Sequence, residues 1–97
     1  MVKQPKPIEV ELSEGKTDAG YEYIEYRIKQ ARVAFIAQET PKGWWVVYRL
    51  STRPGGRPDM LTVERPGQKG LADCFAQEGV AEFCADWAPD RPVSKLR

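Results

Sequence analysis

The sequence contains no histidine, and this absence removes several kinds of catalytic and metal site. Among the 97 residues there is no histidine and there are only two cysteines, Cys74 and Cys84. Histidine is the most common general base near neutral pH and the most common metal ligand. Ser-His-Asp and Cys-His centres are therefore excluded. Two lone cysteines without a CxxC pair do not form a zinc site either.

The sequence also lacks the glycine-rich loops that bind phosphate groups. Neither GxxxxGK[ST] nor GxGxxG occurs, and Gly55 and Gly56 lie between prolines and precede no helix. The acidic residues show no spacing that marks a pair for carboxylate-based hydrolysis. We therefore expect no catalytic residue, no metal and no cofactor. An enzyme of unknown type ranks third among the functions considered below.

Long apolar runs and a charge of one dominant sign are absent as well. No run approaches the ~20 apolar residues that cross a bilayer, and the first residues, MVKQPKPIEVE, have no apolar core of the signal-peptide kind. We expect a cytoplasmic chain without membrane contact, in which Cys74 and Cys84 are both reduced and buried. Fifteen basic and 14 acidic residues leave a net charge of +1, so net charge identifies no partner.

The length and the terminal composition predict one domain over residues 1–97. A chain of this size has room for a single core. Residues 1–7 contain two prolines and two lysines, and residues 90–97 follow a proline and have mixed polarity. We expect both ends to be flexible tails.

The densest apolar segment predicts a β-hairpin. Residues 33–37 and 44–50 are two strand-length runs rich in β-branched and aromatic residues, and residues 39–43 between them contain Pro41 and Gly43 for a turn. Alternation on the second strand sends one set of side chains to one face, Trp44, Val46, Tyr48 and Leu50, and another set to the opposite face, Trp45, Val47 and Arg49. Both faces are largely apolar, so the hairpin needs further strands and a helix over its more apolar face.

Two shorter segments have the pattern of strands. Residues 8–12 alternate strictly between apolar and polar, and polar residues 13–20 then predict a turn region. Residues 60–63 predict another strand after a loop over residues 53–58, where two prolines and two glycines exclude regular pairing.

Residues 21–38 are ambiguous, because their apolar residues fit both helical spacing and alternation. We favour strands, with a strand over 21–28 that turns near Gln30, because the strand over 44–50 needs a neighbour that comes just before it in the chain. One continuous helix over 21–38 stays as the alternative.

The pattern becomes helical from Leu71 to Ala88. The apolar residues there fall at helical spacings of three, four and seven, and they are Val80, Phe83, Cys84 and Trp87. Gly79 costs about 1 kcal/mol relative to Ala, which favours a late helix start near Ala76. The expected fold class is α+β, a small two-layer domain in which one C-terminal helix packs on an antiparallel sheet of four to five strands.

Basic residues gather in one part of the sequence, between positions 49 and 69. This segment holds five of them against Asp59 and Glu64, and they are Arg49, Arg53, Arg57, Arg65 and Lys69. Arginines on Gly/Pro-rich loops beside aromatic residues are typical of sheet modules that bind a phosphate backbone. The alternative is that they keep a loop soluble, and a pI of 7.7 is low for a nucleic-acid-binding domain.

Acidic residues dominate the predicted helix. Glu78, Glu82 and Asp86 are spaced by four and form one ridge, here called the acidic ridge, while residues 70–90 contain no Lys or Arg. Like charges at this spacing destabilise a helix by ~0.2–0.5 kcal/mol per pair, and Asp86 lies at the unfavourable end of the helix dipole. A docking surface for a basic protein partner accounts for this pattern, and so does a solvated face.

One aromatic residue is a further candidate. Trp45 shares its predicted face with Arg49 and would be half exposed if the helix covered the opposite face. An exposed Trp beside an Arg has the composition of a binding hot spot, but a Trp under a stacked Arg is equally good packing.

These patterns predict a small, non-enzymatic interaction protein. Its partner is expected to be a protein, bound through the acidic ridge, through exposed sheet aromatics such as Trp45, or through both. The alternative is a nucleic-acid-binding sheet module that uses the basic segment.

Overall fold

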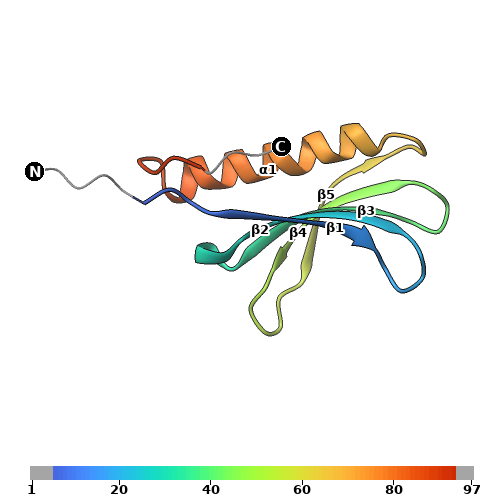
Figure 1. Cartoon of the computed structure of the whole chain (residues 1–97), viewed down its shortest axis with the longest axis horizontal. Helices are drawn as coiled ribbons and strands as arrows, with labels where there is room; N and C mark the ends of the chain where they lie inside the picture. Colours follow the sequence, from blue (N-terminus) through green and yellow to red (C-terminus); the bar gives the residue numbers. More distant parts are fainter. Residues whose placement is uncertain (1–5, 94–97) are drawn as a thin grey trace, which may run out of the picture.

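Five antiparallel strands and one long helix make up the structure, a computed structural model that describes residues 6–93 (Figure 1). The elements are β1 (Val10–Lys16), β2 (Glu22–Ile28), the short 3₁₀ helix η1 (Lys29–Ala31), β3 (Val33–Glu39), β4 (Trp45–Ser51), β5 (Pro58–Glu64) and α1 (Lys69–Trp87). The strand order is β1-β2-β3-β4-β5, so every strand pairs only with its neighbours in sequence. The predicted α+β fold class is confirmed, with five strands and one C-terminal helix.

The predicted hairpin is β3 and β4, which pair from Val33 with Ser51 to Glu39 with Trp45. Its turn is closed by Gly43, whose φ of 84° is a conformation that residues with a side chain rarely adopt. Residues 21–38 form β2, η1 and β3, so the prediction of two strands with a turn near Gln30 is confirmed and the continuous helix is wrong. Pairing of β3 with strands on both sides satisfies its backbone and overrides the local helical spacing.

Strand β1 lies further along the chain than predicted. It begins at Val10 and ends at Lys16, whereas the alternation indicated residues 8–12 followed by a polar turn over 13–20. All seven residues pair with β2, up to Lys16 opposite Glu22. An edge strand whose side chains are mostly exposed needs no apolar alternation, because its backbone pairing alone holds it in the sheet.

The two ends of the described chain lie side by side. Ile8 makes a parallel bridge with Val93, and its backbone N–H donates a 2.8 Å hydrogen bond to the carbonyl oxygen of Pro92. Arg91 Nε donates a 2.8 Å hydrogen bond to the carbonyl oxygen of Lys6. The flexibility expected of residues 1–7 and 90–97 stays a prediction. The remaining tail residues, 1–5 and 94–97, lie outside the described residues.

Helix α1 packs through a stripe of small and medium residues at a spacing of four, namely Ala72, Ala76, Val80 and Cys84, all of them buried. Of the four predicted contact residues, Val80 and Cys84 are buried and Phe83 is partly buried, but Trp87 is 42% exposed. The sequence prediction gave weight to large apolar residues, whereas alanines allow the helix to approach the sheet closely. The predicted late start near Ala76 is also wrong, since α1 begins at Lys69.

One face of the sheet is covered by α1 and the other is uncovered (Figure 1). The covered face includes Trp45 and Val47 of β4, which are buried with Phe35 of β3 in the core. We call the opposite side of the sheet the open face; its residues alternate with those of the covered face. A partly buried hydrogen bond connects the helix to the sheet, because Tyr26 Oη donates to Asp73 Oδ1 at 2.5 Å. Within residues 6–93 no helix is long and apolar enough to cross a membrane.

Candidate functional site

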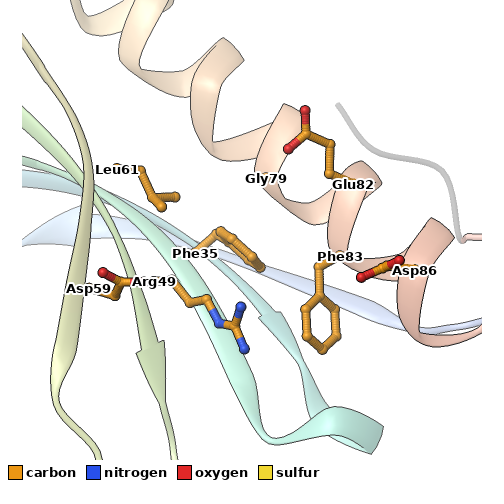
Figure 2. Close-up of a pocket in the computed structure, with 8 residues that line it drawn as sticks. All are labelled: Phe35, Arg49, Asp59, Leu61, Gly79, Glu82, Phe83 and Asp86. Carbon is orange, nitrogen blue, oxygen red and sulfur yellow. The ribbon is translucent and has the colours of Figure 1, made fainter.

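A groove of about 250 Å³ runs between α1 and the β4–β5 edge of the sheet (Figure 2). We call it the α1–β5 groove. Side chains from four elements line it, together with one glycine: Phe35, Arg49, Asp59, Leu61, Gly79, Glu82, Phe83 and Asp86. A β-bulge between Val47 and Tyr48 shifts the register of β5 against β4, because Val47 pairs with Thr62 and Tyr48 with Met60. Leu61, the extra residue of β5 at the bulge, lines the groove together with Asp59.

Aromatic rings form the floor of the α1–β5 groove. The ring centroids of Phe35 and Phe83 are 6.2 Å apart with an interplanar angle of 59°. Arg49 Cζ lies 5.1 Å from the centroid of the Phe83 ring, a cation–π distance, and Figure 2 shows Phe83 projecting from α1 towards Arg49. Trp87 continues the aromatic row, since it stacks on Phe83 at 5.9 Å and 24°. The floor therefore already binds one guanidinium and presents a further exposed ring beside it.

Gly79 allows the helix to lie this close to the floor. A Cβ atom at this position would come within 2.6 Å of Cδ1 of Phe35, a distance that real Cβ atoms do not show. Any larger residue would push α1 away from β3 and change the shape of the groove. The glycine that argued for a late helix start thus has a packing role that its helix propensity does not reveal.

Three carboxylates surround the floor, from Asp59 on β5 and from Glu82 and Asp86 on α1. With Arg49 as the one basic side chain, the groove has a formal net charge of −2. Asp59 is the cross-strand neighbour of Arg49, yet among residues 6–93 none of the three carboxylates forms a salt bridge or a side-chain hydrogen bond. The groove thus combines unpaired negative charge with apolar rings.

The acidic ridge is exposed, and two of its three members reach the groove. Glu78, Glu82 and Asp86 are all exposed on α1. Glu82 and Asp86 line the groove beside Phe83, so the ridge adjoins Phe83 at one flank of the helix. Asp59 and Phe35 belong to the groove but were not among the predicted site residues, because only the strand register brings β3 and β5 beside α1.

The basic residues do not form one surface. Arg53 and Arg57 lie in the β4–β5 turn, whereas Arg65 and Lys69 lie beyond the other end of β5, a strand of seven residues and therefore ~23 Å long. Lys69 is paired with Glu22 at 3.6 Å, and Arg49 lies in the groove over Phe83. The grouping in sequence reflects a strand that runs the length of the sheet between them.

The three tryptophans and two cysteines also differ from expectation in part. Trp45 is 2% exposed under α1, so its predicted half-exposed position is wrong, while Trp44 before β4 is 40% exposed. The helix covers the face that carries Trp45, opposite to the arrangement that would have exposed it. Cys84 is buried, which raises the pKa of its thiol, but Cys74 is exposed, contrary to expectation.

The fold and the groove define a small α+β domain with an acidic, aromatic-floored groove. Comparisons of the chain with protein-family models, with curated proteins and with solved structures find no match. Within residues 6–93 no three Cys, Asp or Glu residues are placed to hold a metal ion together. The functional argument therefore rests on the chemistry of the groove itself.

Proposed function

We propose that the protein is a non-enzymatic interaction protein, and that the α1–β5 groove binds a basic segment of a protein partner. The observation that carries this proposal is the meeting, in one groove, of an aromatic floor with three carboxylates that have no ion-pair partner among residues 6–93. A Lys or Arg side chain satisfies both features, because its charge pairs with a carboxylate while its stem or its planar head lies on a ring.

Arg49 shows within the protein itself how a guanidinium group can bind to the floor of the groove. Its guanidinium already lies over one ring of the floor at 5.1 Å, and Trp87 presents a second, more exposed ring stacked on the first. A cation from the partner placed over Trp87 would lie next to Phe83 in the same aromatic row. Indole is the strongest cation–π acceptor among the side chains.

The energetics of the acidic ridge support a role in binding. Two like-charged pairs at a spacing of four, with an acid at the carboxyl end of the helix dipole, cost α1 ~1 kcal/mol in all. A single lysine at Glu82 would remove most of that cost. Substitutions that relieve such a cost are functionally neutral where no site is involved, and a binding role would account for the cost in this sequence.

The test uses capped eight-residue peptides, in which two Arg or Lys residues alternate with Gly and Ser, against the isotope-labelled protein. We expect amide shifts in α1 near Gly79 and Phe83 and binding that weakens with salt. In Glu82→Gln/Asp86→Asn the affinity should fall about tenfold, since each exposed ion pair contributes up to ~1 kcal/mol. A thermal melt of Glu82→Lys should show a rise of a few degrees together with loss of peptide binding.

The matched control removes the same charge elsewhere. Glu9 and Asp18 are exposed and lie near β1, away from the groove, so Glu9→Gln/Asp18→Asn should keep the affinity of the wild type. An equal loss in the control, or no binding at millimolar peptide and 50 mM salt, would overturn the proposal. Salt-dependent binding of single- or double-stranded oligonucleotides that Arg53→Ala/Arg57→Ala weakens would instead favour the nucleic-acid alternative.

A further inference from the structure

The open face of the sheet is apolar in the half formed by β3, β4 and β5. From the strand register, its side chains are Ile36 and Gln38 of β3, Val46, Tyr48 and Leu50 of β4, and Met60 and Val63 of β5. Trp44 adjoins them at the start of β4. None of these side chains is charged, whereas β2 places Glu25 and Arg27 on the same side of the sheet as an ion pair at 3.2 Å. The open face therefore has an apolar half and a charged half.

This apolar half has both projecting side chains and a hollow. Trp44, Met60 and Val63 are large apolar residues that are exposed to solvent. A cavity of about 400 Å³ lies among Gln38, Val46, Tyr48, Leu50, Pro58 and Met60. A surface with projecting side chains beside a hollow can pack against a second copy of itself across a twofold axis. The projecting side chains of each copy then fill the hollow of the other.

The charges of the molecule favour a second copy as the occupant. Around a twofold axis every charge approaches its own copy, so the centre of an isologous interface should be free of charge, as this half of the face is. The chain carries a net charge of only +1, so two copies approach without long-range repulsion. The α1–β5 groove, in contrast, carries a net negative charge and would repel an identical groove.

The apolar half is large enough for the core of such a contact, but not for all of it. Three strands of seven residues span roughly 23 by 14 Å when flat, or roughly 320 Å², at ~3.3 Å per residue and ~4.8 Å between strands. A specific interface buries about 800 Å² per partner and has an apolar core with a polar rim. The apolar half would supply the core, and the Glu25–Arg27 half with the flanking turns would supply the rim.

We infer that two copies of this chain pack their open faces together, with the sheets in contact and both α1 helices on the outside. Two sheets stacked in this way lie ~10 Å apart with interdigitated side chains. The contact leaves both α1–β5 grooves accessible, so it goes beyond the proposed function and does not depend on it.

Sedimentation velocity between 1 and 200 µM tests this inference on the whole chain. We expect a dimer that dissociates on dilution in the wild type and a monomer at all these concentrations for Val63→Lys, with unchanged far-UV circular dichroism. The matched control is Leu61→Lys on the same strand, since Leu61 faces the groove and is 42% exposed while Val63 is 52% exposed on the open face. Leu61→Lys should remain dimeric.

Two results would overturn the inference. A wild type that sediments as a monomer up to 200 µM would mean that some other molecule covers the open face or that nothing does. Loss of the dimer in Leu61→Lys as well would show association through the edge of β5 instead of the open face. Trp44→Lys provides a second variant for the case that Val63→Lys does not fold, and it too should be monomeric.

Discussion

The two faces of β4 differ less in composition than in what covers them. One face places Trp45 and Val47 under α1, where they join the core, and the other places Val46, Tyr48 and Leu50 on the open side, where they are half-buried. Both sets are β-branched, aliphatic or aromatic. The alternation of a strand thus separates two faces but does not tell which one a helix will cover.

The choice of face follows from the neighbouring elements. The covered face continues across β2 and β3 through Ile24, Tyr26, Ile28 and Phe35, so one helix covers an apolar surface that spans β2, β3 and β4. The open face meets Glu25 and Arg27 after three strands. A helix laid over that side would bury an ion pair at a high desolvation cost.

Two adjacent tryptophans offer the largest expected contrast between the faces. Trp45→Ala should lower the free energy of unfolding by about 3–5 kcal/mol, because it removes a ring that is 2% exposed in the core. Trp44→Ala should cost the monomer less than about 1.5 kcal/mol, since Trp44 is 40% exposed. Urea denaturation at 1 µM, where the inferred dimer is least populated, measures both. Equal losses would contradict the assignment of the covered face.

Two glycines of α1 give the next contrast. Gly79→Ala should destabilise by about 1–2 kcal/mol, because the new methyl group would lie 2.6 Å from Phe35 and the overpacking outweighs the gain of ~1 kcal/mol in helix propensity. Gly70→Ala is the control in the same helix, since nothing lies within 4 Å of the added atom. It should be neutral or slightly stabilising in the same denaturation experiment. Stabilisation by both substitutions would show that α1 does not approach β3 closely at Gly79.

The smallest expected effect concerns Tyr48 on the open face. Burial, with a lesser effect from the charge of Glu25, raises the pKa of Tyr48 above its ordinary value of about 10. Its hydroxyl also donates a 2.9 Å hydrogen bond to Gln38 Oε1. Because the unfolded chain then loses this proton at lower pH than the folded chain, the contribution is complete below pH ~10 and is lost as the pH rises through the folded pKa.

The measurement is the free energy of unfolding between pH 8 and 11, compared with that of Tyr48→Phe. The wild type should lose stability faster than the variant above pH ~10, while titrating lysines affect both chains alike. Parallel curves would mean that Tyr48 ionises as freely in the folded chain as in the unfolded one.

The sequence predicted the fold class well because most of its elements have clear local patterns. The hairpin of β3 and β4 could be predicted from its apolar runs and from a turn containing Pro41 and Gly43. The helix could be predicted from the spacing of Val80, Phe83 and Cys84. The extent of β1 could not be predicted in this way. Polar residues such as Ser13 and Lys16 pair through their backbone alone, so the strand shows no apolar alternation there.

Only part of the site was predictable. Glu82 and Asp86 could be found from their spacing, but Asp59 and Phe35 join them through strand register and a β-bulge, which no local pattern reports. The same dependence on strand geometry explains why the basic residues do not form one surface. Arg57 and Arg65 are close in sequence, yet β5 separates them by its whole length.

The contact between Ile8 and Val93 suggests an order in which the parts of the chain fold. Every other strand pairing joins neighbours in sequence, so the sheet can form hairpin by hairpin with the closure of short loops only. Arg91, in contrast, bonds to the carbonyl oxygen of Lys6, which lies 85 residues earlier in the chain. Closing so long a loop costs much conformational entropy, and only a few hydrogen bonds offset that cost. We expect it to close last, after α1 has docked, and to open first, so that the strand that begins the sheet can loosen at its outer end while the rest stays folded.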